Sequence, residues 1–513
     1  MAEFEHPGVF VEELERGPRP IEGVPTSTAA FLGEAERGSI RPQLVTGFAD
    51  YQRWFGDTPG CDSLLPDAVH GFFANGGQRL YVCRLAAADA ATAEAPFGDD
   101  FVVHAAGPGA WGNRVFVEIG DGTARGADGN SVGFRLRVAY WSGETAPGFD
   151  PFADGGGGPP PSHVEELDDL VVDEESPDYF GKRLSSAEGP ALVTLVRRPE
   201  AAAGTWPANG AAMLAGGADG GAALGVDDYR GLPTSARPES QGLAALELDA
   251  YRDVALVYAP GAGDDVAATV VEHCDRLRFR FAVIDAPKRV ADDSALQPRE
   301  RIADSTRAAF YYPWIVVADP ATGDRRLVPP GGHVLGVYAR TDAEAGVFKA
   351  PANEVLRGAV GLERDVAEAA QDELARRGVN VIRDFADRGI RVWGARTLSS
   401  DSQWKYVNVR RLFIFLERSI YEGTQWVIFE PNDERLWQRV IDTIRLFLRG
   451  QWRSGALAGR TEQEAFFIRC DRTTMTEDDI LNGRLICEIG IATVRPAEFV
   501  ILRFSHHTAE AGC

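Results

Sequence analysis

The sequence predicts a multidomain protein of mixed α/β and α+β architecture, with an inserted β-rich domain and extended arms at its N- and C-termini. The chain of 513 residues exceeds what one compact core usually holds, so roughly two to four domains are expected. A strand–helix–strand pattern at 253–287 is typical of a parallel α/β sheet. Residues 100–210 instead alternate between apolar and polar side chains, as antiparallel strands do.

The first 25 residues are predicted to form an N-terminal arm, 1–25. A short extended segment, Val9–Glu13, is followed by Pro18, Pro20 and Pro25, which exclude a helix and favour extended backbone. Such a segment cannot bury much of its own surface. It is therefore disordered, or it docks on another surface.

Residues 26–99 are predicted to form the first part of the core. Thr26–Ala35, with the sequence TSTAAFLGEA, is typical of a buried strand, and RLYVCRLA is typical of a second one. Between them, Leu64–Gly77 is typical of a short helix that ends at glycine.

Residues 100–210 are predicted to form the inserted β-rich domain. The stretches FVVHAAGPGAWGNRVFVEIGDG and SVGFRLRVAYW alternate as strands do and are separated by a turn rich in Gly and Asp. The tract Gly155–Ser162 is predicted to be a loop, because it contains only Gly, Pro and Ser. Pro190–Arg198 adds one more strand.

Residues 211–395 are predicted to form the second part of the core, with α/β character. Asp253–Pro260 and Arg280–Pro287 are predicted strands, joined by a helix with Asp264 or Asp265 near its N-cap. The crossover should be right-handed, which makes the two strands parallel. The segment AAFYYPWIVVADP supplies another strand.

A helix and a hairpin are predicted to complete this second part. The helix, Leu362–Gly378, carries Val366, Ala370 and Leu374 on one face. The segment VNVIRDFADRGIRVWGART is predicted to form a hairpin that turns near Asp387–Gly389.

Residues 396–495 are predicted to form a C-terminal domain, and 496–513 a C-terminal arm. The clearest helix is Pro431–Gly455, which Asn432 can cap. Apolar residues recur every fourth position and predict its buried face: Leu436, Val440, Ile444 and Leu448. Basic rows occupy other parts of its surface: Arg435, Arg439, Arg445, Arg449 and Arg453. Pro496–His507 is a predicted strand with no following segment to form a hairpin with it.

Charge is unevenly distributed along the chain. The net charge of −23 and the pI of about 4.9 argue against nucleic-acid binding by the whole chain. From Arg391 to Cys470, 13 Lys and Arg outnumber 9 Asp and Glu, so this region carries +4 and the rest carries −27. The basic region suggests a surface for an acidic partner, with chance variation along a long chain as the alternative.

Cysteine usage and the N-terminus indicate the compartment. The six scattered cysteines contain no Cys-x-x-Cys pair, so a zinc ribbon or a redox motif of that kind is not expected. Neither a signal peptide nor an apolar run long enough for a membrane helix is visible. Synthesis and folding in a reducing cytoplasm are therefore expected.

The sequence carries no strong catalytic, cofactor or metal motif. Walker A, dinucleotide-binding and His-Glu-x-x-His patterns are absent. GNSVG matches the Gly-x-Ser-x-Gly hydrolase pattern, but Ser131 precedes a strand rather than a helix. His333 lies in a predicted glycine-rich loop, PPGGHVLG, whose pattern is too loose to indicate a phosphate site. His506, His507 and Cys513 are as well explained by a polar tail. We expect no catalytic residues, no cofactor and no metal.

The segment VWGARTLSSDSQWKYVNVRRLF, Val392–Phe413, concentrates polar residues after an apolar strand. Ser399 and Ser400 have no histidine within 60 residues on either side to act as a base, so a structural role is favoured. Asp401 is expected to end a turn before a strand at Trp404–Tyr406. Four cations of this segment are expected to fix core or inter-subunit contacts: Arg396, Lys405, Arg410 and Arg411.

Seven ordered segments carry a family resemblance: HPGVFVEE, GVPTSTAAFLGEAERG, FFANGGQRLYVCRL, GVYARTDAEAGVFKAPAN, GIRVWGARTLSSDSQWKYVNVRRLFIFLERSI, QWVIFEPND and LNGRLICEIGIATVRPAEFVILRF. Together they resemble the contractile tail sheath family of contractile-tailed phages and extracellular injection systems. The similarity is densest from about 335 to the C-terminus and recurs at 7–85.

The resemblance implies a fold and a role. The core would be a subtilisin-like α/β core without the catalytic residues of the protease, with 100–210 as an outer domain and 396–495 as the inner sheath domain. Subunits would form stacked hexameric rings around an inner tube, and contraction would drive the tube through a target envelope. The implied partners are other copies of the chain, the tube protein, and baseplate and terminator or cap proteins. Neither nucleic acid nor direct membrane insertion is implied, and assembly in the bacterial cytoplasm is expected.

The resemblance also implies roles for particular residues. The arms would add strands to the sheets of neighbouring subunits through backbone hydrogen bonds. The candidate inter-subunit strand residues are Val9, Phe10, Val11, Phe499, Val500, Ile501 and Leu502. The arginine rows of the 431–455 helix would face an acidic tube, with an ordinary solvated face or salt bridges within the sheath as the alternative. Two other functions stay open at this point: an α/β hydrolase-like enzyme, and a non-contractile scaffold or adhesin that uses the β-rich insertion.

Overall fold

The computed structural model describes residues 20–56, 63–127, 129–143, 150–152, 158–186, 189–202, 204–234, 239–318 and 323–498. The chain divides into two compact units. The larger unit is Pro25–Arg410, and the smaller unit combines Met1–Val24 with Arg411–Cys513. Helix α10, Val407–Gly423, contains the boundary between them.

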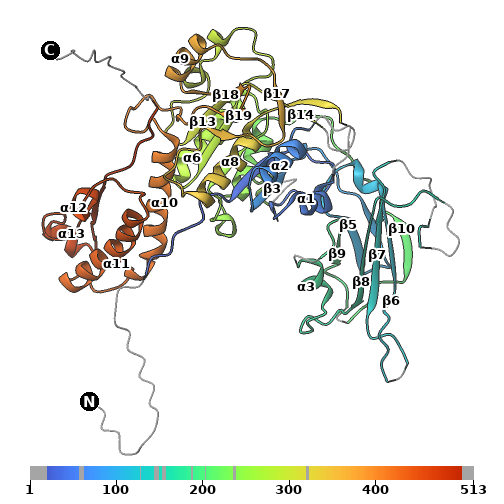
Figure 1. The fold of residues 1–513 in the computed structure, drawn as a ribbon. Helices are drawn as coiled ribbons and strands as arrows, with labels where there is room; N and C mark the ends of the chain where they lie inside the picture. Colours follow the sequence, from blue (N-terminus) through green and yellow to red (C-terminus); the bar gives the residue numbers. More distant parts are fainter. Residues whose placement is uncertain are drawn as a thin grey trace, which may run out of the picture. The chain divides into compact units, whose positions relative to one another are not determined.

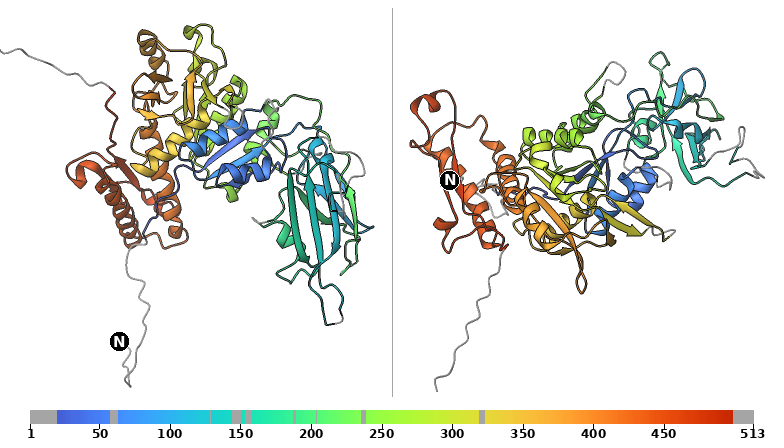
Figure 2. Two further views of the ribbon diagram at one scale, coloured as in Figure 1. Left: turned by 45° about the vertical axis from the view of Figure 1, so that its right-hand side comes forward. Right: turned by 90° about the horizontal axis from the view of Figure 1, so that it is seen from above.

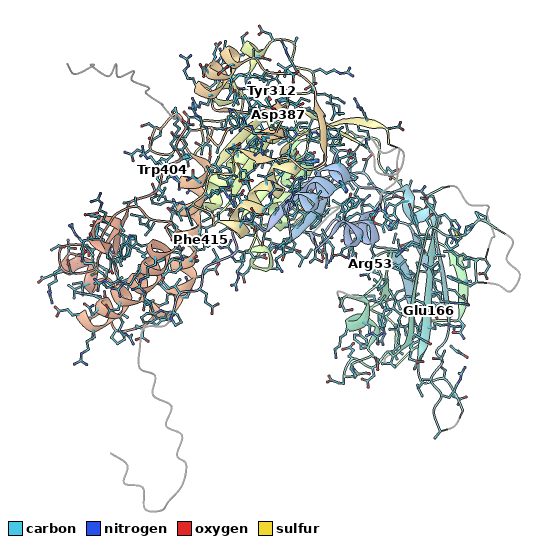
Figure 3. All side chains as sticks on the ribbon, viewed as in Figure 1. Arg53, Glu166, Tyr312, Asp387, Trp404 and Phe415 are labelled. Carbon is cyan, nitrogen blue, oxygen red and sulfur yellow. The ribbon has the colours of Figure 1, made fainter. Side chains whose placement is uncertain are left out.

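A nine-stranded sheet is the main element of the larger unit (Figure 1). Its strand order is β16–β19–β18–β13–β12–β11–β1–β3–β2. The six strands from β18 to β3 pair in parallel, and β16, β19 and β2 are antiparallel to their neighbours. Their bounds are β1 Ala29–Gly33, β2 Gln43–Val45, β3 Leu80–Arg84, β11 Leu256–Tyr258, β12 Phe281–Asp285, β13 Ala308–Tyr312, β16 Glu354–Val355, β18 Val379–Phe385 and β19 Gly389–Val392. The parallel pairing of β11 and β12 and the β18–β19 hairpin, whose turn contains Asp387 (Figure 3), confirm two sequence predictions.

Helices cover both faces of this sheet (Figure 2). Ala282 of β12 belongs to a core cluster with the apolar face of α6. The preceding residue, Phe281, points to the other face and meets Tyr338 of α8, with ring centroids 6.4 Å apart. On that face Phe31 also meets Phe72 of α2, at 5.4 Å. The helix bounds are α2 Leu65–Ala74, α6 Asp264–Leu277 and α8 Gly331–Glu344. Burial on both sides explains why the central strands are continuous apolar runs.

Glycines allow α2 and α8 to pack very closely. A Cβ atom added to Gly336 would lie 2.6 Å from the Cβ of Asn75, and one added to Gly332 would lie 2.6 Å from the Cα of Ala68. Both distances are shorter than van der Waals contact, so a side chain at either position would separate the helices. The predicted loop at PPGGHVLG is therefore wrong: His333 lies in the first turn of α8, because tertiary packing overrides the low helix propensity of glycine.

The remaining elements of the larger unit include two short segments that differ from the sequence prediction. AAFYYPWIVVADP forms two strands in different sheets, β13 and β14, because β14 pairs with β15 and β17 in a separate three-stranded sheet. The predicted helix from Leu362 is shorter at its N-terminus, because Leu362 pairs with Ile315 in the β14–β17 ladder and α9 begins at Glu368. The bounds are β14 Ile315–Ala318, β15 Arg325–Val328, β17 Ala359–Leu362, α1 Phe48–Phe55, α4 Val226–Arg230, α5 Gly242–Ala245, α7 Pro298–Arg301 and α9 Glu368–Arg376.

Residues 94–213 contain the predicted β-rich region as two antiparallel sheets. One has the order β10–β6–β7–β8 and the other β4–β5–β9. They share a core that includes Phe101, Trp111 and Leu136. The bounds are β4 Glu94–Pro96, β5 Phe101–Ala105, β6 Val115–Asp121, β7 Phe134–Tyr140, β8 His163–Leu170, α3 Phe180–Leu184, β9 Val193–Arg197 and β10 Gly210–Met213.

The smaller unit is built on α10 and α11, with a two-stranded sheet. Asp433, rather than the predicted Asn432, caps α11: its side chain accepts a hydrogen bond from Leu436 N at 2.8 Å. Asn432 Oδ1 instead accepts from Trp437 Nε1 at 2.7 Å. At the start of the described chain, Val24 N donates to Ser419 Oγ of α10 at 3.1 Å. The bounds are α11 Glu434–Arg453, α12 Glu462–Ala465, β20 Phe466–Arg469, α13 Glu477–Leu481 and β21 Glu488–Ile491.

Candidate functional site

Helix α11 has one buried face and one cationic face. The predicted residues Leu436, Val440, Ile444 and Leu448 are all buried, which confirms the apolar face. The helix packs against β20 and α12. Because side chains three and four residues apart share a helix face, Arg435, Arg439, Arg449 and Arg453 lie together on the opposite side. Arg445 lies at the border of this group.

Three of these arginines are held by acids of the same unit. Arg439 donates to Glu430 at 2.6 Å, and its guanidinium lies 4.9 Å from the centre of the Trp426 ring. Arg449 donates to Glu462 at 2.7 Å, a hydrogen bond that raises the pKa of Arg449. Arg445 is 3.6 Å from the same Glu462. These contacts order the guanidinium groups on the surface, and exposed ion pairs of this kind are weak and break readily.

The two ends of the cationic face differ from its middle, because their arginines are not paired with acids in the described chain. Arg435 and Arg453 are exposed, and neither makes an ion pair with any residue that the structure describes. Leu446 lies between them on the same face and is 49% exposed. The face therefore combines uncompensated positive charge with an apolar centre. That combination suits an acidic partner surface that also buries apolar area.

The β20–β21 hairpin forms a second candidate surface. Its register pairs Phe466 with Ile491 and Arg469 with Glu488. Within the described residues this sheet has only two strands, so the outer edge of each strand has no ladder partner there. A two-stranded sheet is marginally stable alone, and an open edge accepts further strands. Sequence reasoning missed this hairpin, because each strand has only four residues; the alternation in FFIR and EIGI is the available signal.

The predicted strands that would pair with such an edge are not described by the structure. Val9, Phe10 and Val11 lie in the first 19 residues, and Phe499, Val500, Ile501 and Leu502 lie beyond residue 498. Both described ends, Pro20 and Glu498, belong to the smaller unit. The described chain therefore begins and ends in the unit that contains the β20–β21 hairpin.

The polar loop after β19 is fixed by hydrogen bonds to backbone groups. Asn380 is 1% exposed and accepts from Arg396 N at 2.6 Å, while its Nδ2 donates to Arg396 O and Phe310 O. Ser399 Oγ accepts from Asp401 N, and Asp401 Oδ1 accepts from Gln403 N. Trp404 N also donates to Asp401 O at 3.1 Å, so Asp401 begins a turn rather than ending one as predicted. The predicted strand at Trp404–Tyr406 is wrong, because only a bridge from Tyr406 to Arg396 forms before α10 begins.

The four predicted cations of this segment have different surroundings. Arg396 Nη1 donates to Ala375 O at 2.8 Å. Arg410 is buried, and its guanidinium stacks 3.5 Å from the centre of the Trp404 ring, a residue labelled in Figure 3. Lys405 Nζ lies 5.0 Å from the ring centre of Tyr406. Arg411 is buried in the smaller unit, 3% exposed.

The geometry does not support the hydrolase alternative. Ser131 Oγ donates to the carbonyl oxygens of Gly122 and Gly133, so its side chain closes a turn between β6 and β7. His333 is buried in α8, and burial lowers its pKa to about 3. In the described part of the chain, no group of three potential metal ligands occurs. Among the same residues, no helix is long and apolar enough to cross a membrane.

An open sheet edge and a charged helix face are surfaces that suit a structural subunit, whose role is to bind other chains. Comparison with known families is consistent with this class. The family model of the phage tail sheath protein central domain matches residues 235–398, and that of the phage tail sheath C-terminal domain matches 399–506.

Related proteins agree with the family models. A prophage major tail sheath protein of Pseudomonas aeruginosa (strain UCBPP-PA14) is 30% identical over 52% of this chain and 68% of its own length. The tail sheath protein of Salmonella phage ViI is 26% identical over 44% of this chain and 36% of its own length.

Solved structures share the fold over almost the whole chain. The sheath complex of an extracellular contractile injection system, PVC, in its contracted state has a TM-score of 0.60 and 24% identity over 99% of both chains. The helical sheath of the anti-feeding prophage in its contracted state has a TM-score of 0.58 and 25% identity, over 98% of this chain and 99% of that chain. The chain belongs to the phage tail sheath protein family. It is a structural subunit of a contractile tail sheath and not an enzyme.

Proposed function

We propose that this chain polymerises as stacked hexameric rings around an inner tube and contracts to drive the tube through a target envelope. The observation that carries the proposal is the β20–β21 hairpin, a two-stranded sheet whose outer edges are open within the described residues. The N- and C-terminal arms of neighbouring copies would add strands to these edges. Main-chain hydrogen bonds would then link subunits into a mesh.

Linkage by arms explains how rings could move without separating. Backbone hydrogen bonds depend little on side-chain detail, and an extended proline-containing linker, 15–25, can change direction while its end stays docked. Contraction needs no cofactor if the extended state is less stable than the contracted one. A difference of about a few kcal/mol between two packings, multiplied over many copies, would drive the movement.

Proline substitution in the arms tests this linkage. Val11→Pro or Ile501→Pro removes one backbone N–H donor and is expected to abolish cylinders in negative-stain electron microscopy. The controls, Val11→Ile and Ile501→Val, keep the donor and should assemble normally. If both proline variants form normal cylinders, strand addition by the arms is excluded. Cylinders that never shorten would instead support a non-contractile scaffold.

The cationic face of α11 is the proposed contact with the tube, through Arg435, Arg439, Arg445, Arg449 and Arg453. The proposal depends most on Arg435 and Arg453, because they make no ion pair within the described part of their own subunit and their charge is available to a partner. Exposed charge pairs hold a partner yet break easily, which suits a tube that must be released. The acidic charge expected of the tube would complement this face.

Charge reversal distinguishes tube contact from a solvated face. Arg435→Glu with Arg453→Glu should leave sheath assembly and thermal stability unchanged but abolish co-assembly with the tube protein. A matched control is Arg230→Glu with Arg252→Glu, which reverses two exposed arginines of the larger unit. Normal co-assembly of the α11 variant would exclude this face as the tube contact.

We further propose the finer features that the family resemblance implies. The nine-stranded sheet would be the subtilisin-like core, 100–210 the outer domain and 396–495 the inner sheath domain. Baseplate and terminator or cap proteins would bind the two ends of the sheath, and Arg396, Lys405, Arg410 and Arg411 would support inter-subunit contacts. Assembly would take place in the bacterial cytoplasm.

A further inference from the structure

Two cysteines far apart in the sequence meet at the end of the β20–β21 hairpin. The register pairs Phe467 with Gly490 and Arg469 with Glu488, so its continuation places Cys470 opposite Cys487. Residues directly opposite in an antiparallel pair have Cα atoms about 4.5–5.5 Å apart, within the range of disulfides. The two thiols are also within hydrogen-bonding reach of each other.

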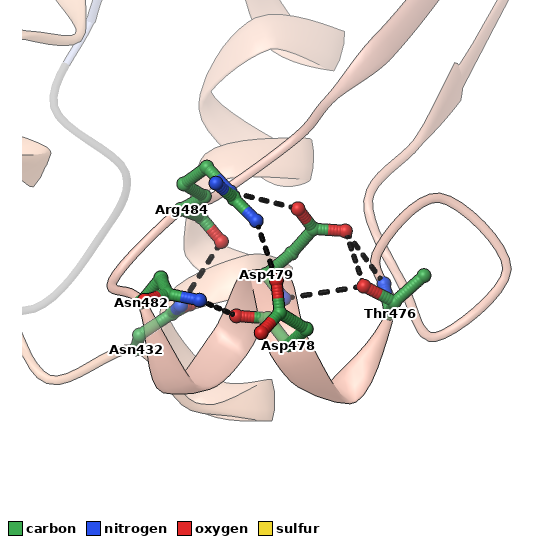
Figure 4. A network of polar contacts seen from close by, with 6 residues as sticks. All are labelled: Asn432, Thr476, Asp478, Asp479, Asn482 and Arg484. Atoms are coloured by element: carbon green, nitrogen blue, oxygen red, sulfur yellow. Dashed lines mark hydrogen bonds and ion pairs between the residues drawn. The ribbon is translucent and has the colours of Figure 1, made fainter.

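The surroundings keep this pair in register. Thr474 Oγ1 donates to Asp471 O and Ile486 O, both at 2.9 Å, and thereby joins the two limbs of the loop one residue beyond the cysteines. The loop itself is ordered by polar contacts around α13 (Figure 4). Arg484 binds Asp478 and Asp479, and Thr476 caps the helix through Asp479 N. A bond between the cysteines would therefore close a loop that is already folded.

The two thiols differ in access and in acidity. Cys470 is 2% exposed, whereas Cys487 is partly exposed. The hydrogen bond from Cys487 lowers the pKa of Cys470, and the same interaction together with burial raises the pKa of Cys487. An external reagent thus reaches Cys487 first, and Cys470 is the better nucleophile behind it.

We propose that Cys470 and Cys487 form a thiol-oxidation site, at which a small-molecule disulfide such as oxidised glutathione closes a disulfide bond across the hairpin. Cys487 first passes its proton to the Cys470 sulfur to which it is hydrogen-bonded, because its own pKa is raised. The Cys487 thiolate then attacks one sulfur of the reagent and forms a mixed disulfide, and the departing thiolate takes up the proton from Cys470 and leaves as a thiol. Cys470 then attacks the sulfur of Cys487 and releases the second thiol. The protein loses two hydrogen atoms and two electrons, and the reagent gains them as two thiols.

Two adjacent thiols can also act as metal ligands, which is the alternative to disulfide formation. A structural zinc ion takes four ligands. Among the described residues no third Cys, His, Asp or Glu completes a cluster with this pair. The other described cysteines, Cys83 and Cys274, are fully buried in the larger unit and are not hydrogen-bonded to a second thiol. The pair is therefore assigned to thiol–disulfide chemistry, which goes beyond the proposed assembly function and does not depend on it.

Peptide mapping tests the site directly. The test protein is the full-length chain with Cys61→Ser and Cys513→Ser, incubated with oxidised or reduced glutathione. Trypsin cuts after Arg469, Arg472 and Arg484, so Cys470 and Cys487 fall on different peptides that only a disulfide links. The expected result is this linked pair and the loss of two titratable thiols in the oxidised sample.

Single variants and a matched control complete the test. With Cys470→Ser, the resolving thiol is absent, so a stable mixed disulfide with glutathione is expected at Cys487. Cys274→Ser, which removes a buried thiol elsewhere, should still form the bond. The proposal is overturned if the native pair stays fully alkylatable after oxidation, or if the mixed disulfide at Cys487 persists in the native protein.

Discussion

The close packing of α2 against α8 predicts that a single methyl group at Gly336 destabilises the larger unit. In Gly336→Ala, the new Cβ would lie 2.6 Å from the Cβ of Asn75 and still closer to Phe72 O. Ordinary contact begins near 3.4 Å, and the obstructing backbone of α2 cannot rotate away as a side chain can. The helices would have to separate by about an ångström, and overpacking of this kind typically costs about 1–3 kcal/mol.

A polar network between α2 and α8 raises the free-energy cost of separating the two helices. Asn75 Oδ1 accepts from Arg357 N at 2.8 Å, and Arg340 Nη1 of α8 donates to Asn75 O at 3.0 Å. Separation lengthens the bond between Arg340 and Asn75, in a buried region where an unmade hydrogen bond costs about 1–3 kcal/mol. Alanine recovers about 1 kcal/mol of helix propensity. The net expectation is a loss of about 1–5 kcal/mol.

Chemical denaturation followed by circular dichroism measures this loss, with Gly450→Ala as the matched control. Gly450 lies inside α11, and a Cβ there meets no atom within 4 Å. The same substitution should therefore stabilise the smaller unit by up to about 1 kcal/mol. The packing argument fails if Gly336→Ala is as stable as the unmodified chain, or if the two variants shift stability in the same direction.

Further predictions concern a buried carboxyl, a loop anchor and an acid on the cationic face. Burial raises the pKa of Asp285 to about 6, although it accepts hydrogen bonds from Tyr258 Oη and from two backbone N–H groups. Because the folded pKa is the higher one, its contribution is fully present below about pH 4 and lost as pH rises through 6, about 3 kcal/mol in total. Denaturation at several pH values should show this slope in the native chain but not in Asp285→Asn. Asn380→Ala removes three hydrogen bonds, to the backbone N and O of Arg396 and to Phe310 O, and should cost about 2–3 kcal/mol, whereas Asp387→Ala in the exposed hairpin turn should cost little. Glu462→Gln frees Arg449 and leaves Arg445 paired only with Asp442, so sheath–tube complexes should survive higher salt; unchanged salt sensitivity would contradict the tube assignment.

The sequence was most informative where a local pattern and burial coincide. The apolar residues Leu436, Val440, Ile444 and Leu448 predicted the buried face of α11, and the structure confirms all four. The parallel β11–α6–β12 unit was predictable because its strands are continuous apolar runs around an amphipathic helix. The acidic residues predicted near the N-cap of α6 are there: Asp264 and Asp265 lie in its first turn, directly after the cap at Gly263.

Predictions failed where long-range packing decides local structure. Gly331 and Gly332 predict a loop by propensity, yet they begin a helix, because a side chain would collide with Tyr258 of β11 at Gly331 and with Ala68 of α2 at Gly332. Leu362 fits a helical pattern, yet it joins a strand because Ile315 offers a ladder partner. In each case the competing contact comes from a residue far away in the sequence, so no local window contains the information.

The features of the candidate surfaces also separate into those that the sequence predicts and those that require the tertiary structure. By itself the sequence determined the family resemblance, the arginine rows of α11 and the lack of a catalytic motif, because these depend on residue type and short spacing. Only the tertiary structure decided which arginines are already paired with acids of their own subunit and which are not. Only the register of β20 and β21 brought Cys470 and Cys487 together, although 16 residues separate them in the chain. Pairing between strands is set by three-dimensional contact, and no spacing along the chain encodes it.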